Sequence, residues 1–91
     1  MLMYVAVQHS IFDPASFWDI VEKTPLPSNV ILHHTFPSTS GDHAICIWEA
    51  ETVEAVRSIV EQAVGNYSRN EYFQVENKQA IAKPVLFRSA A

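Results

Sequence analysis

The pattern of hydrophobic and polar positions divides the chain into four strand-like runs. Residues 2–9, 29–36 and 44–48 are rich in β-branched and aromatic side chains, which is typical of strands. Residues 70–76 alternate between apolar and polar side chains, as a half-buried strand does. The first and third of these segments are apolar on both alternating faces, so we expect them to lie at the centre of a sheet.

Two further segments have the apolar spacing of helices. The first follows Asp13 and Pro14, which suit the N-cap and the first helical position. It must end before Pro25, because proline disfavours helical geometry in the residue that precedes it. The second predicted helix covers residues 52–64, and Gly65 follows it as a C-terminal cap.

The order of these elements is β-α-β-β-α-β, which predicts an α+β, ferredoxin-like fold. This fold is a four-stranded antiparallel sheet with both helices on one face. We expect it to occupy residues 1–77 as one domain. Residues 78–91 form a C-terminal tail that we interpret as an extra edge strand, as an arm onto a partner subunit, or as a partly disordered segment.

Two helices can cover only one face of such a sheet. The other face would then expose either Ile45 and Ile47, or Cys46 and Trp48. Contiguous apolar patches of that size are rare on soluble monomers. Because buried apolar area contributes about 25 cal/mol per Å², hiding several hundred Å² favours association by several kcal/mol. The sequence therefore predicts a homodimer that pairs through the sheet face, with two-fold symmetry as the commonest closure.

Composition and charge exclude several classes of partner. The 91 residues contain 6 Lys and Arg against 10 Asp and Glu, a formal net charge of −4. Such a chain lacks the basic surface that binding to nucleic acid or to anionic membranes requires. No apolar segment approaches the roughly 20 residues of a membrane-spanning helix, and the first residues lack the basic region of a signal peptide. We expect a cytoplasmic protein with no nucleic-acid or membrane partner.

Candidate site residues come from the ends of the predicted strands, because no strong catalytic or phosphate-binding motif is present. His9 ends the first strand and Glu49 ends the third. We expect these two strands to run parallel, which would place both residues at one edge of the sheet. If the hairpin is centred near Ser40, Ile31 faces Glu49 and His33 is a diagonal neighbour of Glu49, about 7–8 Å away between Cα atoms.

Two kinds of chemistry suit this predicted cluster. His9, His33 and Glu49 could hold a divalent transition metal, since imidazole and carboxylate groups both bind such ions. Alternatively, Glu49 could orient a histidine for acid–base catalysis, and Tyr72 begins the fourth strand at the same edge. The structural alternatives are that Glu49 accepts from the start of the second helix and that the histidines are ordinary strand residues. His33 and His34 should point to opposite faces.

The remaining candidate residues have ordinary structural explanations. Cys46 lies between two isoleucines, where a thiol behaves as a small hydrophobe and has a raised pKa. His43 falls at the turn end of its strand, away from the predicted cluster. Several large side chains belong either to the core or to a pocket between sheet and helices: Phe17, Trp18, Leu32, Phe36 and Trp48.

The segment from the third strand into the second helix carries a family-like pattern. It reads Ile45-Cys46-Ile47-Trp48-Glu49-Ala50, followed by Glu54-Ala55-Val56-Arg57. This resembles small ferredoxin-like proteins of unknown function in the dimeric α/β-barrel superfamily. Their strand reads roughly Y-C-[IV]-Y-E-A, so Trp48 replaces a tyrosine. A V-x-L-H segment on the preceding strand matches residues 30–33, and a histidine that closes the first strand matches His9. The resemblance covers residues 4–76.

The resemblance has functional implications. Some family members are described as nickel-binding, which implies a metal such as nickel on His9, His33 and Glu49. The wider superfamily includes cofactor-independent monooxygenases, isomerases and haem-degrading enzymes. We therefore consider three hypotheses. The first is a small ligand- or metal-binding homodimer. The second is a monooxygenase or isomerase acting on a small aromatic or lactone-like compound, with His33 or His9 as base and a tyrosine, Tyr72, as donor. The third is an interaction module without a site.

Overall fold

The computed structural model describes residues 2–76 and residue 81, and its element order matches the sequence pattern. The elements are β1 (Met3–Ile11), α1 (Pro14–Lys23), β2 (Val30–Pro37), β3 (His43–Ala50), α2 (Val53–Val64) and β4 (Ser68–Gln74). The fourth strand begins two residues earlier than expected and ends two residues earlier. The predicted tail, residues 78–91, lies outside the described residues apart from Ile81.

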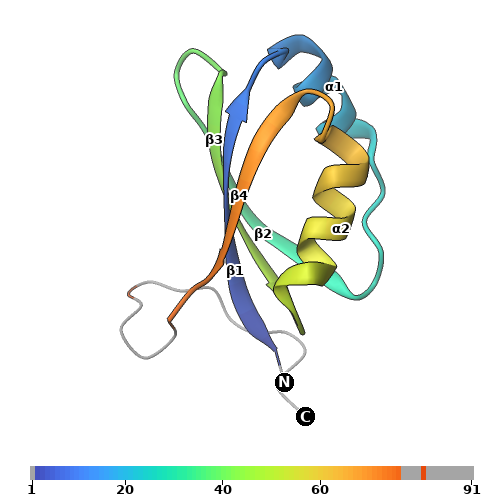
Figure 1. Ribbon diagram of the computed structural model, residues 1–91, viewed down its shortest axis with the longest axis vertical. Helices are drawn as coiled ribbons and strands as arrows, with labels where there is room; N and C mark the ends of the chain where they lie inside the picture. Colours follow the sequence, from blue (N-terminus) through green and yellow to red (C-terminus); the bar gives the residue numbers. More distant parts are fainter. Residues whose placement is uncertain (1, 77–80, 82–91) are drawn as a thin grey trace.

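The four strands form one antiparallel sheet in the order β2-β3-β1-β4. Helices α1 and α2 lie side by side on the same face of this sheet (Figure 1). This is the expected α+β, ferredoxin-like fold, with β1 and β3 as the central strands. We call the face that the helices cover the inner face and the opposite face the outer face.

The expectation that the first and third strands run parallel is wrong. β1 and β3 are antiparallel, with Met3 opposite Ala50 and His9 opposite Ala44. The reason is topological. The crossover through α1 makes β2 run in the direction of β1, and the tight hairpin then reverses the chain, so β3 must oppose β1. The C-terminal end of β1 therefore lies beside the N-terminal end of β3.

The hairpin register is as expected at its start, where Ile31 pairs with Glu49. The register then shifts between Leu32 and His34, which marks a β-bulge at His33. Because His34 pairs with Ile47, and Ile47 and Glu49 share a face, His33 and His34 both lie on the outer face. The expectation that the two histidines point to opposite faces is therefore wrong, and the extra residue is the reason.

Both helices begin with the cap that the sequence indicates. The Asp13 side chain accepts from the Ser16 N–H at 3.2 Å, and the Thr52 hydroxyl accepts from the Ala55 N–H at 3.1 Å. Each such bond satisfies a donor that the first helical turn cannot satisfy itself, which stabilises the helix by about 1 kcal/mol.

A second contact ties α1 to the β2–β3 hairpin. The Trp18 indole N–H donates to the carbonyl oxygen of Gly41 at 3.0 Å. Gly41 has a φ of +79°, a left-handed conformation that glycine adopts without the steric cost of a Cβ atom. The turn geometry thus presents a carbonyl to the helix and fixes the position of α1 over the sheet.

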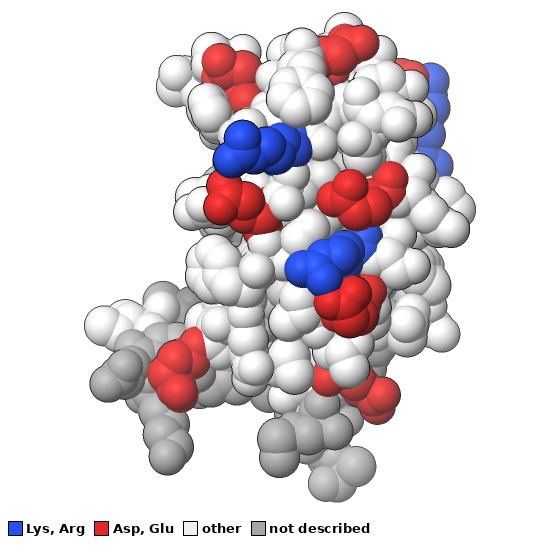
Figure 2. All heavy atoms as spheres, viewed as in Figure 1, with Lys and Arg blue, Asp and Glu red and all other residues white. Residues whose placement is uncertain are grey.

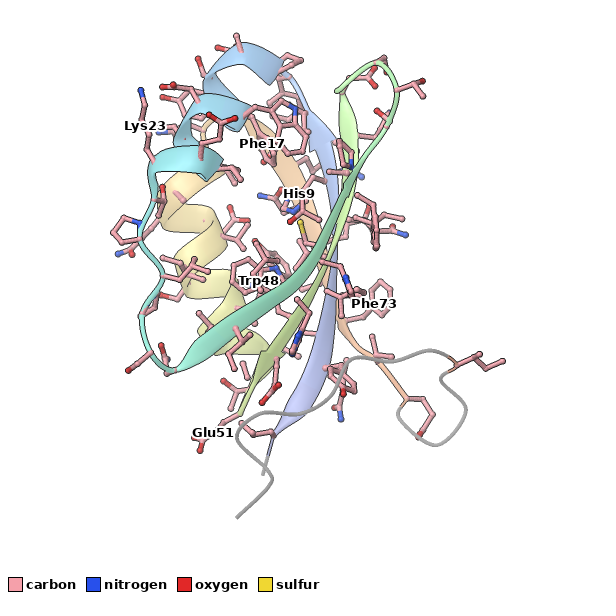
Figure 3. The ribbon with its side chains drawn as sticks, turned by 180° about the vertical axis from the view of Figure 1, so that it is seen from behind. His9, Phe17, Lys23, Trp48, Glu51 and Phe73 are labelled. Carbon is pink, nitrogen blue, oxygen red and sulfur yellow. The ribbon has the colours of Figure 1, made fainter. Side chains whose placement is uncertain are left out.

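The two faces of the sheet differ in what they bury. The inner face carries the core, in which Val5, Val7 and Trp48 pack against buried helix residues such as Phe17 and Val56. The outer face exposes large apolar side chains: Phe36 at 59%, Phe73 at 49% and Ile45 at 46%. Figure 3 shows Phe73 on the side of the sheet away from the helices. Of the two alternatives for the uncovered face, the isoleucine pair is therefore the correct one.

Charged side chains do not form a basic surface on the face shown in Figure 2, where lysines and arginines lie beside acidic residues. Two of the close ion pairs among the described residues are Lys23 with Asp19 at 2.8 Å and Arg57 with Glu54. Within the described part of the chain, none of the helices has the length and apolar character to cross a membrane.

Candidate functional site

A cavity of about 100 Å³ lies between the inner face and the two helices. Figure 3 shows His9 and Trp48 on the helix side of the sheet, with Phe17 of α1 above them. The cavity wall is mostly apolar and is formed by His9, Phe17, Val21, Thr24, Leu26, Leu32, Thr35, Cys46, Trp48, Ile59, Val60, Ala63 and Val64. Because β-strands and both helices contribute, the cavity belongs to the core itself rather than to a surface loop.

One side of the cavity faces the connection between α1 and β2. Leu26 in this connection is 44% exposed, and Thr24 at the end of α1 is half-buried. Cys46, Val60 and Val64 on the opposite wall are buried. The gradient from exposed to buried lining residues places the entrance at the α1–β2 connection.

His9 is the only histidine among the lining residues, and it is 4% exposed. Its Nδ1 atom lies 2.5 Å from Oδ1 of Asn70 on the neighbouring strand β4. Two further bonds fix how the Asn70 amide is turned. Its NH₂ group donates to a carboxylate oxygen of Glu61 at 2.9 Å, and its oxygen accepts from the Ser68 hydroxyl at 2.8 Å.

This network decides the protonation pattern of the His9 ring. Since Oδ1 of Asn70 can only accept, Nδ1 of His9 must carry the hydrogen. Burial lowers the pKa of His9, although the Asn70 bond and the Glu61 charge oppose the shift, so the ring is neutral at pH 7. In the neutral ring Nε2 holds a lone pair, and no described residue donates to it. Phe17 packs edge-on against the ring at 5.2 Å between centroids.

Tyr72 joins the same network but does not line the cavity. Its hydroxyl donates to Glu61, and its ring lies under the Arg57 guanidinium at 4.9 Å. Burial, together with the hydrogen bond to Glu61, raises the pKa of Tyr72 far above its usual value. Glu61 was not a candidate from sequence, because its position off the apolar stripe of the helix is also that of an ordinary solvent-facing residue.

Cys46 and Trp48 form the floor of the cavity on β3. The Cys46 thiol lies 3.6 Å from the Thr35 hydroxyl oxygen and donates to it. Burial raises the pKa of Cys46, as expected from the sequence, so the thiol is not an activated nucleophile. The Trp48 indole nitrogen is buried and has no hydrogen-bond acceptor among the described residues. Leu32 and Phe17 also line the cavity, whereas Phe36 lies on the outer face.

A separate polar pair lies on the outer face. Nε2 of His33 and Oε1 of Glu49 are 2.9 Å apart, and their side chains are 7% and 0% exposed. The second carboxylate oxygen of Glu49 has no hydrogen-bond partner in the described structure. The Tyr4 ring meets the His33 ring edge-on at 6.1 Å, and burial, with the nearby Glu49 charge, raises the pKa of Tyr4.

The structure brings His33 and Glu49 together, as expected, but it does not bring His9 to them. His9 lies on the inner face near the start of β3, and Glu49 lies on the outer face near its end. The described residues also contain no group of three or more His, Cys, Asp or Glu side chains arranged to hold a metal ion. The described structure therefore does not bring His9, His33 and Glu49 into one cluster, because that arrangement depended on parallel central strands.

Two smaller expectations also fail. Thr52, not Glu49, caps helix α2, so the carboxylate does not serve the helix start. His43 lies opposite Ser10 and therefore at the same end of the sheet as His9, although it is exposed. The antiparallel pairing of β1 and β3 explains the second difference as well.

Comparison with known proteins adds no relative: no family model, no curated protein and no solved structure matches this chain.

Proposed function

We propose that this protein binds a small, predominantly apolar organic molecule in the cavity between the sheet and the helices. The observation that carries the proposal is the cavity of about 100 Å³, which is lined by apolar side chains and contains one buried imidazole with an unengaged nitrogen. Apolar lining with a few placed polar groups is the usual composition of a small-molecule site.

The size of the cavity limits the ligand. A cavity of about 150 Å³ holds benzene, and drug-sized ligands need about 300–1,000 Å³. The present cavity of about 100 Å³ is smaller, so a ligand of about six or seven heavy atoms must extend in part towards Leu26 at the entrance.

Fragment-sized probes test this proposal. We expect toluene, phenol or cyclohexanone at millimolar concentration to shift the NMR signals of cavity-lining residues. Replacing Ala63→Leu fills the cavity from α2 and should abolish these shifts. The matched control Ala55→Leu makes the same change on the same helix away from the cavity and should retain them. If no probe binds, or if Ala63→Leu binds as the wild type does, the proposal is wrong.

An enzyme acting on such a molecule is the second candidate, favoured by one observation. His9 is neutral and oriented by Asn70, which is the arrangement of a general base. His33 is not a base for this cavity, because it lies on the other face. The base would take an α-proton from a small ketone onto Nε2 and return a deuteron in D₂O. Deuterium exchange into cyclohexanone should be faster with wild-type protein than with His9→Leu, and equal rates would exclude this role.

We also propose that the outer face pairs with a second copy of the chain, as in the dimeric α/β-barrel superfamily. On this face Tyr4, Ala6 and Glu49 are already buried within the chain, so the surface available to a partner lies around the exposed apolar side chains. A standard interface buries about 800 Å² on each partner. Phe36, Ile45 and Phe73 supply the large apolar side chains that such an interface needs.

The oligomeric state tests the dimer. Sedimentation at micromolar concentration should give about twice the 10.2 kDa mass of the chain. Phe36→Glu should shift the protein to monomer, because it places a charge in the apolar face. Leu26→Glu is the control, since Leu26 is also exposed but lies on the helix side. A wild-type monomer, or a Phe36→Glu dimer, would contradict this assembly.

A further inference from the structure

We infer that the cavity selects neutral molecules that donate a hydrogen bond, such as phenols and enols, and that Nε2 of His9 is the acceptor. This inference rests on the proposed binding function and specifies its ligand class. The arrangement that carries it is the chain of hydrogen bonds from Glu61 through Asn70 to His9.

The first step is the fixed tautomer of His9. The carboxylate of Glu61 can only accept, so it holds the NH₂ group of Asn70, and the Asn70 oxygen is left to face Nδ1 of His9. The Ser68 hydroxyl donates to the same oxygen and reinforces this orientation. The hydrogen of the neutral ring therefore stays on Nδ1, and Nε2 is a hydrogen-bond acceptor with no donor among the described residues.

The second step is the cost of leaving that acceptor unpaired. His9 is 4% exposed and lines the cavity, so in the free protein only water inside the cavity can donate to Nε2. A purely apolar ligand would displace water from Nε2 without replacing its hydrogen bond, whereas a hydroxyl group would donate to it. A ligand with a carbonyl oxygen at this position would set two lone pairs against each other.

The third step is the charge of the ligand. The cavity wall contains no Asp, Glu, Lys or Arg side chain. A carboxylate or an ammonium group would be desolvated there without a counter-charge, which is costly. A neutral hydroxyl on a small unsaturated or aromatic ring satisfies both the acceptor and the apolar wall, which includes Phe17 and Trp48.

Phenol and toluene test this selectivity, because each has seven heavy atoms and they differ in the donor. A net hydrogen bond of about 0.5–1.5 kcal/mol corresponds to about two- to tenfold tighter binding of phenol. In His9→Leu the preference for phenol should disappear while toluene still binds. Asn70→Ala should weaken the preference and let the hydrogen move between the two ring nitrogens of His9.

The outcomes separate this inference from the proposed function. If toluene and phenol bind equally well, the donor selectivity is wrong and the binding function remains. If neither binds, the binding function itself is wrong. A His9→Leu variant that keeps the phenol preference would overturn the role of His9.

A measurement on the wild type covers the case in which His9→Leu does not fold. Long-range ¹H–¹⁵N NMR should show the hydrogen of His9 on Nδ1, and phenol should perturb Nε2 more than toluene does. A hydrogen on Nε2 in the free protein would overturn the inference.

Discussion

The two faces of the sheet each hold a buried histidine, and the two differ in their partner. On the inner face, His9 bonds a neutral amide that is itself held by two further groups. On the outer face, His33 bonds a carboxylate, Glu49, whose second oxygen has no partner among the described residues. In the first arrangement Nδ1 of the ring is hydrogen-bonded, and Nε2 remains available to a ligand in the cavity. The second is a pair of groups that depend on each other.

The comparison shows that residue type alone does not assign a role to a histidine. Burial keeps the His9 ring neutral and the amide partner fixes its tautomer, which suits hydrogen-bond recognition. A carboxylate partner couples two ionisable groups, which makes the loss of either one expensive. The following predictions test this difference, beginning with the largest effect.

Replacing His33→Ala should reduce the free energy of unfolding by about 3–5 kcal/mol, because it leaves a buried carboxylate without its partner. Urea denaturation measures this loss. The double variant His33→Ala/Glu49→Gln should recover part of it, since the buried charge is then removed. A loss of less than about 1 kcal/mol in the single variant would show that the pair does not act as a unit.

Replacing Asn70→Ala should have a smaller effect of about 1–3 kcal/mol, because the group left unpaired is a neutral imidazole. The same urea experiment measures it. Asn29→Ala is the control, since Asn29 is exposed in the α1–β2 connection. An Asn70→Ala variant less stable than His33→Ala would reverse the ranking of the two faces.

Lowering the pH should destabilise the protein through His9. The folded-state pKa of His9 lies below its ordinary value of about 6.5, so the unfolded chain binds a proton before the native protein does. The contribution of His9 to the free energy of unfolding is therefore complete above about pH 6.5. Below that pH it decreases, by at most about 1.4 kcal/mol per pH unit. In His9→Leu this part of the pH dependence should vanish, whereas an unchanged slope would show that His9 titrates normally.

Much of the fold could be predicted from the sequence because its signals are local. Asp13 and Pro14 begin one helix, and Thr52 begins the other, at positions where side-chain chemistry favours a helix start. The pairing of Ile31 with Glu49 followed from the centre of a short hairpin, and it correctly placed His33 beside Glu49.

The candidate site could be predicted only in part, because it depends on relations between distant strands. The direction of β3 relative to β1 is set by the two connections between them, and no pattern within either strand indicates it. His9 was therefore expected at the end of the sheet that holds Glu49, whereas it lies at the other end, opposite Ala44. The role of Glu61 depends on the packing of α2 against β4. This packing brings the side chains of Asn70 and Tyr72 on β4 within hydrogen-bonding distance of the Glu61 carboxylate. No spacing within either element indicates this contact.

The bulge at His33 decides which side chains of β2 meet the cavity. Beyond it, Thr35 lies opposite Cys46 on the inner face, and His34 lies opposite Ile47 on the outer face. If His33 were paired with Ile47 in a strand without the bulge, His34 would lie opposite Cys46 on the inner face and Thr35 opposite Ile45 on the outer face. The bulge in this edge strand thus determines that a hydroxyl and not an imidazole faces the cavity from β2, and a strand of the same length without the bulge would be expected to accept different molecules.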